Sequence, residues 1–289
     1  QVKDINSGSD SGDPDYPIVY DNRLFFRANN GSDGDELWVS DGTTSGTNLF
    51  IDINPSGNGS PSDFAVYKGK LYFQADDGVH GEELWISDGT EGGTVLVKDI
   101  RTTGGLYAEY TAAASGGRIF FSADDGKSNK TELWVSDGTA GGTVMVKNIN
   151  PAESSSPEMI TAVGNRVFFA ADDGTNDYEL WVSDGTESGT ALVKNINPSS
   201  DASLDYLTDV NGTLFFKASD GTAGNELWKS DGTALGTEMV KDINTGGGSS
   251  PQYLCNVSGT LYFAADDGIN GTELWKSDGT ALGTEMVKD

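Results

Sequence analysis

The sequence predicts an all-β fold built from six repeats, and three observations support this prediction. A motif close to ELWVSDGT recurs six times, and the glutamates that open it are 47, 49, 47, 47 and 47 residues apart. Each copy contains one of the six tryptophans of the chain. No window carries an apolar period of 3.6 residues, so helices are not expected. The six copies begin at Glu36, Glu83, Glu132, Glu179, Glu226 and Glu273.

The second repeat shows the elements that every copy shares. Four short apolar segments, typical of strands, cover residues 64–67, 71–73, 83–86 and 95–97. Lys68 and Gly69 separate the first two segments and are typical of a two-residue hairpin turn. Each repeat is therefore predicted to be a four-stranded antiparallel meander.

Six such units of about 47 residues favour a six-bladed β-propeller with one meander per blade. A β-helix is the rival, but its coils are shorter and do not supply four strands per repeat. The first strand should lie nearest the propeller axis, where only modest side chains fit. The residues at its centre are Ile18, Ala65, Ala113, Thr161, Thr208 and Cys255.

A single domain over residues 1–289 is expected, because one repeat could hardly bury both of its faces alone. The predicted repeats are 17–63, 64–111, 112–159, 160–206, 207–253 and 254–289. Residues 1–6 read as an extra fourth strand that closes the ring, although residues 285–289 also read as a fourth strand. Residues 226–242 and 273–289 are identical, which indicates duplication within a larger repeat array. The opening in mid-repeat suggests a processed product or an excerpt from a longer chain.

The composition limits the classes of partner. The chain has 45 Asp and Glu against 18 Lys and Arg, a formal net charge of −27. Such a surface repels phosphate backbones, so no nucleic-acid partner is expected. No apolar run is long enough to span a bilayer, so membrane insertion is not expected either. Cys255 is the only cysteine, which rules out an internal disulfide but leaves the compartment open.

The repeated text ELWxSDGTxxGT resembles the bacterial ELWxxDGT repeat family, and the resemblance covers nearly the whole chain. It implies a secreted or surface-attached, propeller-like module, and an extracellular or cell-surface location. It implies little about activity, because that family is defined by its repeat. The third copy departs from the pattern by being two residues longer near Lys127.

The motif itself is interpreted as a building block. Trp85 and its equivalents are expected to pack between adjacent blades, and the alternative is an aromatic platform for sugars. The Ser-Asp-Gly-Thr segment is expected to form the turn between the third and fourth strands, because Ser and Asp side chains accept backbone N–H bonds and Gly permits a positive φ. It resembles the structural Asp-box turn of sialidase-type propellers.

Binding is predicted on the face that carries the longer, more varied loops. That face holds the loops between the second and third strands and those that join consecutive repeats, such as residues 54–62. It also holds a series of acidic turns. Their carboxylates are the candidate metal ligands Asp76, Asp77, Asp124, Asp125, Asp172, Asp173, Asp220, Asp266 and Asp267.

Calcium is the cofactor these acidic turns suggest, since hard cations bind several oxygen ligands. However, adjacent aspartates lack the alternating spacing of the D-x-[DN]-x-[DN]-G loop. Ordinary Asx turns before glycine are therefore the alternative.

Catalysis is not expected. His80 is the sole histidine and has no equivalent in the other repeats, Cys255 reads as a small interior residue, and no G-x-S-x-G motif appears. Paired carboxylates could hydrolyse glycosides, so a glycoside-acting enzyme is the last alternative.

The sequence thus favours a non-catalytic extracellular adhesion or binding module that recognises a glycan or a protein on a cell surface or matrix. The alternative is a purely structural unit of a surface array or fibre.

Overall fold

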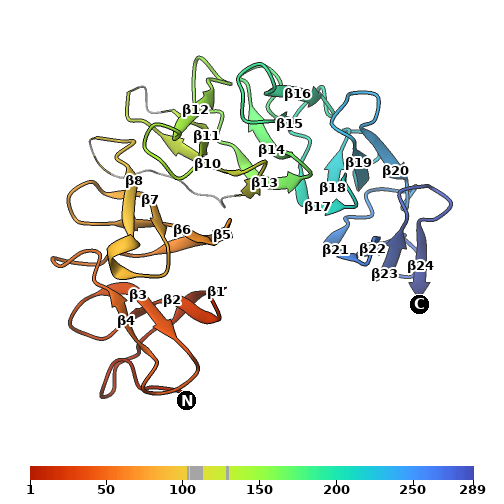
Figure 1. The fold of residues 1–289 in the computed structure, drawn as a ribbon. Helices are drawn as coiled ribbons and strands as arrows, with labels where there is room; N and C mark the ends of the chain where they lie inside the picture. Colours follow the sequence, from red (N-terminus) through yellow and green to blue (C-terminus); the bar gives the residue numbers. More distant parts are fainter. Residues whose placement is uncertain (103, 105–112, 128–129) are drawn as a thin grey trace. The chain divides into compact units, whose positions relative to one another are not determined.

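The computed structural model describes residues 1–289 except residues 103, 105–112 and 128–129. Within the described residues, all regular structure is β apart from one 3-10 turn, η1 (Glu91–Gly93). Six four-stranded sheets follow one another along the chain, each with its strands in chain order (Figure 1). Residue contacts divide the chain into two compact units, Gln1–Val144 and Met145–Asp289, and each is described by itself.

The strands of the first three sheets are β1 (Asp15–Tyr20), β2 (Arg23–Asn29), β3 (Asp35–Ser40) and β4 (Asn48–Ile51); β5 (Ser62–Tyr67), β6 (Lys70–Asp76), β7 (Glu82–Ser87) and β8 (Val95–Lys98); and β9 (Ala113–Ser115), β10 (Arg118–Asp124), β11 (Thr131–Ser136) and β12 (Val144–Lys147). Those of the last three are β13 (Glu158–Val163), β14 (Arg166–Asp172), β15 (Tyr178–Ser183) and β16 (Ala191–Lys194); β17 (Asp205–Val210), β18 (Thr213–Ser219), β19 (Asn225–Ser230) and β20 (Glu238–Lys241); and β21 (Gln252–Val257), β22 (Thr260–Asp266), β23 (Thr272–Ser277) and β24 (Glu285–Lys288).

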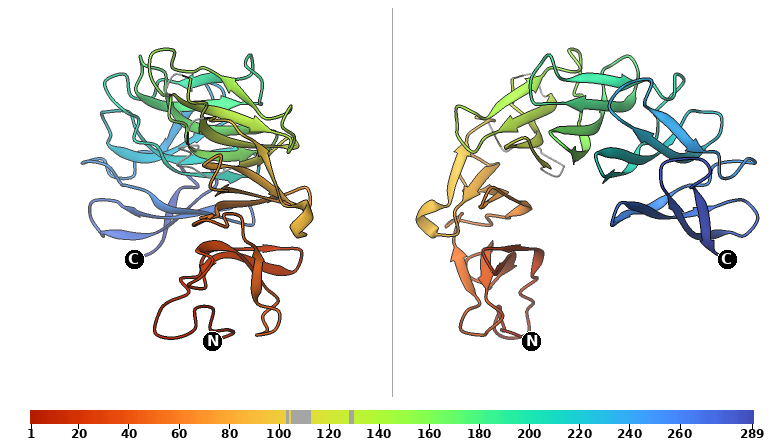
Figure 2. Two further views of the ribbon diagram at one scale, coloured as in Figure 1. Left: turned by 90° about the vertical axis from the view of Figure 1, so that its left-hand side faces the viewer. Right: turned by 45° about the vertical axis from the view of Figure 1, so that its right-hand side comes forward.

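Each sheet is the antiparallel meander that the sequence predicts, so the all-β fold with four strands per repeat is confirmed. The strands of a sheet twist relative to one another, as the two views of Figure 2 show. The six sheets give the chain a propeller-like repeat fold.

The first strand of five sheets begins two residues before the predicted repeat, because a β-bulge extends it. In β5 the register with β6 shifts between Ser62 and Ala65, and Asp63 inside this shift has a φ of 52°. Such a bulge inserts an extra residue and bends the strand. The residues with positive φ at this position are Tyr16, Asp63, Met159, Tyr206 and Tyr253. None is a glycine, so the sequence carries no signal for the bulge.

The core lies between consecutive sheets of each unit, and the tryptophan of one sheet packs against the sheet before it. Trp85 of β7 belongs to the same buried cluster as Phe50 and Ile53, which follow β3 in the preceding repeat. In the second unit, Trp228 likewise clusters with residues of β16. The predicted packing role of the tryptophans is therefore confirmed.

The Ser-Asp-Gly-Thr segment forms the predicted hydrogen-bonded turn. In the second sheet, the Ser87 hydroxyl accepts the N–H of Gly89 at 3.1 Å and lies 2.7 Å from the buried hydroxyl of Thr94. Asp88 Oδ1 accepts both the N–H of Thr90, at 3.1 Å, and its hydroxyl, at 2.7 Å. These four bonds leave little freedom to the turn, so the octet is a structural building block.

A lysine at the end of the fourth strand links each of several sheets to the next. Lys98 of β8 donates to the carbonyl oxygen of Thr143 at 2.7 Å and lies over the ring of Trp134 at 5.9 Å. Three pairs of the second unit repeat this bond: Lys147 with Thr190, Lys194 with Thr237 and Lys241 with Thr284.

The N-terminal segment makes the same link to the first sheet. Lys3 Nζ lies 2.5 Å from the carbonyl oxygen of Thr47 and 5.9 Å from the ring centroid of Trp38. Ile5 packs against the cluster that contains Trp38. Residues near the N-terminus therefore contact sheet β1–β4 as a fourth strand contacts the following sheet.

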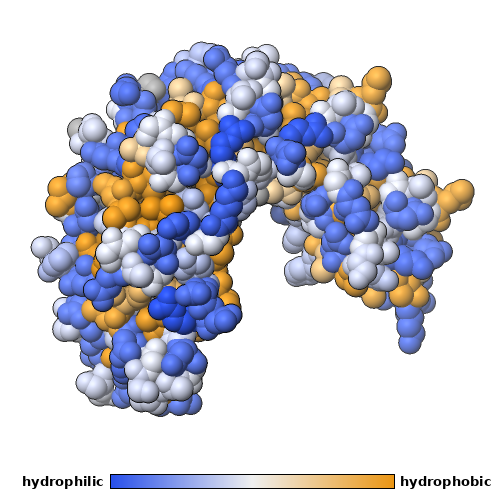
Figure 3. All heavy atoms as spheres, viewed as in Figure 1, coloured by the Kyte–Doolittle hydropathy of each residue, from blue (hydrophilic) through white to orange (hydrophobic). Residues whose placement is uncertain are grey.

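On the face drawn in Figure 3, polar residues are widespread and hydrophobic side chains are visible between them. Cys255 on β21 is exposed, so its expected interior position was wrong. The reason is that β21 belongs to the last sheet of the second unit, and no later sheet of that unit covers it. No helix in the described part of the chain is long and apolar enough to cross a membrane.

Replacing Trp85 by alanine is expected to lower the free energy of unfolding by about 3–5 kcal/mol, since it removes a large buried side chain between two sheets. Urea denaturation followed by circular dichroism measures this loss. Val79→Ala is the control, because Val79 is 81% exposed and its truncation should change stability by about 0.5 kcal/mol or less. Equal effects of the two substitutions would contradict the packing role.

Candidate functional site

The aspartates predicted to bind calcium lie in hydrogen-bonded turns between the second and third strands. In the second sheet, Asp76 Oδ1 accepts the N–H of Gly78 at 2.7 Å, and Asp77 Oδ1 accepts the N–H groups of Val79 and His80 at 2.9 and 2.8 Å. The same bonds recur at Asp172 with Asp173 and at Asp266 with Asp267; Asp124, Asp125 and Asp220 accept N–H groups two residues on. These are the Asx turns that the sequence left as the alternative.

Most of the second carboxylate oxygens in these turns also have a partner. The Oδ2 atom of Asp173 accepts a bond from the Asn176 amide at 2.8 Å, and that of Asp124 contacts Arg101 at 2.9 Å. The N–H of Asn270 holds the pKa of Asp267 below its usual value. Among the residues that the structure describes, no group of three or more His, Cys, Asp or Glu is placed to hold a metal ion. Calcium binding stays a prediction, and the geometry favours the turn.

His80 lies in one of these turns and forms a hydrogen bond with its aspartate. Its Nδ1 atom lies 2.7 Å from Asp77 Oδ2, and this hydrogen bond raises the pKa of the imidazole. The only histidine of the chain is thus paired with a carboxylate three residues away, at the surface.

The glutamate that opens the repeated motif forms hydrogen bonds with the long loop that leads to the next repeat. Glu36 is fully buried, and its carboxylate accepts the N–H of Ile53 at 2.8 Å, of Asn54 at 3.3 Å and of Gly59 at 2.7 Å. Glu226 likewise accepts the N–H of Ile243 at 3.1 Å. The loop of residues 54–62, predicted as a binding loop, is therefore held to the scaffold at Asn54 and Gly59.

Burial gives these carboxylates an unusual protonation equilibrium. Desolvation raises the pKa of Glu36, Glu83 and Glu179 to about 7, although backbone N–H bonds oppose the shift. No role was predicted for this glutamate from the sequence. Its presence in all six motifs could have indicated a structural role, because an exposed residue need not recur in every repeat.

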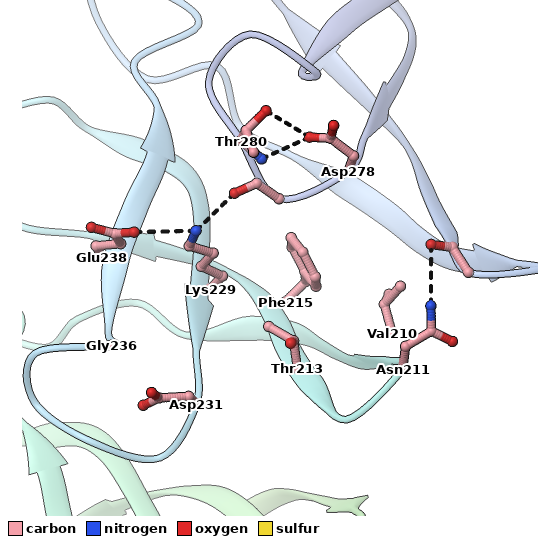
Figure 4. Close-up of a pocket in the computed structure, with 12 residues that line it drawn as sticks. Val210, Asn211, Thr213, Phe215, Lys229, Asp231, Gly236, Glu238, Asp278 and Thr280 are labelled. Carbon is pink, nitrogen blue, oxygen red and sulfur yellow. Dashed lines mark hydrogen bonds and ion pairs between the residues drawn. The ribbon is translucent and has the colours of Figure 1, made fainter.

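A cavity of about 460 Å³ lies between the fifth and sixth sheets of the chain, both in the second unit, on the side of the tight turns (Figure 4). It falls in the size range of small-ligand sites. The turn before β18, strands β18 to β20 and the turn after β23 supply its lining. The prediction that binding features lie on the opposite face, with the long loops, missed this cavity.

The floor and one wall of the cavity come from two residues paired across β18 and β19. Phe215 is buried and lies opposite Lys229 in the register of the two strands. Lys229 Nζ donates to the carbonyl oxygen of Gly279 at 2.8 Å and forms an ion pair with Glu238 at 3.1 Å. Gly279 has a φ of +87°, and a Cβ there would lie 3.1 Å from the ring of Phe215, so only glycine fits easily.

Two exposed carboxylates border the cavity from neighbouring turns. Asp231 and Asp278 each use Oδ1 to bind the N–H and hydroxyl of the threonine two residues on. The threonine hydroxyl lowers the pKa of both aspartates, so both are charged at neutral pH. With Glu238 and one lysine, the lining carries three negative charges against one positive charge.

Two departures from the repeat could have pointed to this cavity. The first residue of the second strand is Arg or Lys in the first four sheets, but Thr213 in the fifth. The partner of Phe215 across the sheet is Lys229, whereas Val182 occupies that place in the fourth sheet. Neither residue was predicted to have a role, because the predictions rested on features that the repeats share.

Comparison with known proteins gives a likeness of fold only. No protein-family model and no curated protein matches the sequence. A puromycin hydrolase mutant complexed with PGG matches with a TM-score of 0.54 and 13% identity, over 95% of this chain and 46% of that chain. Puromycin hydrolase itself matches with 0.47 and 13%, over 99% and 55%, and a prolyl endopeptidase with 0.42 and 12%, over 96% and 49%. This chain thus spans about half the length of the structures it matches.

These matches correct the expected function. The sequence predicted a non-catalytic adhesion module for a glycan or protein, with a structural array unit as the alternative. The match with a TM-score above 0.5 is to a puromycin hydrolase mutant, a chain named for a hydrolase and not for adhesion. The prediction of an adhesion module is therefore contradicted, and the likeness itself is one of fold alone.

Because of the buried glutamates, we expect the free energy of unfolding to fall as the pH rises from about 4.5 to about 7. In this window the unfolded chain ionises these side chains more readily than the folded chain does, so the free energy of unfolding decreases. Below about pH 4.5 the contribution is fully present, and above about pH 7 it is lost. Melting temperatures across this range measure the effect, and Glu83→Gln should reduce its slope.

Glu91→Gln is the matched control for this experiment, because it removes the same charge from an exposed position. If Glu83→Gln and Glu91→Gln have the same slope, then general charge repulsion rather than the buried carboxylates sets the pH dependence.

The acidic turns predict that calcium has little effect on stability. A bound ion would raise the melting temperature with concentration, but most of the turn carboxylates already accept two or more hydrogen bonds. Melts in chelator, then with calcium or magnesium added back, are expected to coincide. A rise that calcium restores and magnesium does not would establish calcium sites at these aspartates.

Proposed function

We propose that this chain is a six-bladed β-propeller domain that accompanies a catalytic domain in a longer hydrolase. The observation that carries the proposal is the fold match to the puromycin hydrolase mutant, which covers 95% of this chain but only 46% of that chain. More than half of that enzyme therefore lies outside the matched fold. In this proposal the repeats supply a rigid support and the chemistry comes from elsewhere in the protein.

The titratable groups of the described residues support this division of labour. The one histidine is engaged with Asp77 in a surface turn, and the one cysteine, Cys255, is exposed on β21. A nucleophile needs a base within hydrogen-bonding distance, and neither residue supplies such a pair. The link to the ELWxxDGT repeat family and the extracellular location stay predictions from the sequence.

The natural protein tests the proposal. Antibodies raised against recombinant residues 1–289 would purify it from its source, and mass spectrometry would measure the length of the polypeptide. We expect a chain longer than this one that hydrolyses aminoacyl or peptidyl nitroanilides, whereas the recombinant chain alone does not. A natural polypeptide of any length that hydrolyses none of these substrates would overturn the proposal.

Closure of the ring is the second part of the proposal. Lys3 and Ile5 contact the first sheet as the last strand of a preceding blade would, so we infer that residues 1–6 help to join the first and last blades. In the sixth sheet β24 already pairs with β23, so the N-terminal segment would have to displace β24 or lie beside it.

A closed ring predicts a compact particle in solution. A single domain of this length has an expected radius of gyration of about 19 Å, and small-angle X-ray scattering measures it. Deleting residues 1–6 should increase the radius, because the segment proposed to join the first and last blades is lost. A wild-type radius far above this value, unchanged by the deletion, would contradict closure.

A further inference from the structure

The first sheet shows what normally fills the place of the cavity described above. Arg23 opens β2, lies over the ring of Phe25 at 5.1 Å and donates through Nη2 to the carbonyl oxygen of Gly89 at 3.0 Å. Gly89 belongs to the Ser-Asp-Gly-Thr turn of the second sheet. The guanidinium group therefore fills the space between two sheets and joins a strand to the next turn.

The fourth sheet repeats this arrangement. Arg166 opens β14, lies over Phe168 at 5.6 Å and donates to the carbonyl oxygen of Asp231 at 2.8 Å. This carbonyl again belongs to the turn of the following sheet. A guanidinium group over an aromatic ring and beside a turn is thus a repeated feature of the chain.

The fifth sheet keeps the surroundings but lacks the guanidinium group. Thr213 stands where Arg23 and Arg166 stand, and its short side chain cannot reach the next turn. Phe215 lines the cavity, and within the described part of the chain no cation lies over its ring. The cavity therefore lies where the first and fourth sheets place an arginine side chain.

We propose that this cavity binds a guanidinium group, supplied by an arginine side chain of a partner polypeptide. The aromatic floor suits a planar cation, and a guanidinium group can form two parallel bonds to a carboxylate. Asp231 and Asp278 present such carboxylates at opposite sides of the cavity (Figure 4).

Lys229 takes over only part of the role of the missing arginine. Its ammonium group donates to the carbonyl oxygen of Gly279, which corresponds to the Gly89 carbonyl that Arg23 binds, and it forms an ion pair with Glu238. Asp231 and Asp278 make their turn bonds through Oδ1 and stay ionised, so the lining keeps negative charge for a cationic ligand, although Arg166 also acts on Asp231 and Lys229 on Asp278. The net charge of −27 adds long-range attraction for cations.

Isothermal titration of the whole chain with Gly-Arg-Gly tests the proposal, with Gly-Lys-Gly and Gly-citrulline-Gly as controls. We expect saturable binding of the arginine peptide, about tenfold or more tighter than either control, because only arginine combines charge with the planar group. Agmatine distinguishes a free small guanidine from a peptide. If agmatine binds as tightly as the peptide, the partner is not a polypeptide.

Two reciprocal substitutions provide the matched variants. Thr213→Arg should place a guanidinium group in the cavity from within the chain and weaken peptide binding about tenfold or more. Its melting temperature should stay at or above that of the wild type, because Arg23 and Arg166 occupy the same position in folded sheets. Arg166→Thr should open the equivalent space in the fourth sheet and add one binding site to those of the wild type.

The outcomes decide the proposal independently of the hydrolase assignment, which the natural protein tests. No saturable binding of the arginine peptide to the wild type, or unchanged binding to a folded Thr213→Arg variant, would overturn the guanidinium site. Equal binding of arginine and lysine peptides that vanishes at high salt would mean general attraction to an acidic surface.

Discussion

A buried carboxylate in each of the first five repeats is the interaction on which the rest of the fold depends. The carboxylate of Glu36 fixes the N–H of Ile53, and the side chain of Ile53 packs in the same cluster as Trp85 of the next sheet. One hydrogen bond therefore sets both the path of the loop and the surface that the next sheet contacts. A buried acceptor satisfied by backbone donors has few alternative arrangements, and this suits a unit that must repeat with constant spacing. The cost is a charge held away from water, which appears as the raised pKa.

The spacing between sheets in turn determines where a ligand can enter. The tryptophans and the lysine links pack the sheets closely, so replacing a long side chain by a short one opens space between two sheets. Thr213 is such a replacement, and the cavity beside it is defined by the same turn that elsewhere accepts an arginine. A rigid support of this kind suits the proposed place beside a catalytic domain.

Much of the fold could be predicted from the sequence because the same strand and turn pattern recurs in every repeat. Apolar alternation and glycine turns indicated the four strands, and Trp85 and Asp88 received roles that the structure confirms. The bulge at Asp63 could not be predicted, since its positive φ is imposed by the sheet and not by a glycine. The burial of Glu36 could not be predicted either, because charged side chains are seldom buried. This carboxylate is stabilised only by backbone N–H groups that the fold places around it. The cavity escaped notice because it depends on contacts between repeats, which a single strand pattern does not contain.

The lysine links give the chain a direction. In several sheets the fourth strand donates an ammonium group to a carbonyl oxygen of the following sheet, as in a head-to-tail polymer. Because these joints use the same residues, a whole repeat can be gained or lost among them without new surfaces having to be matched. Near-identical neighbours, such as residues 226–242 and 273–289, are the substrates that unequal recombination requires. The architecture therefore permits its blade number to change in one genetic step while each joint stays intact.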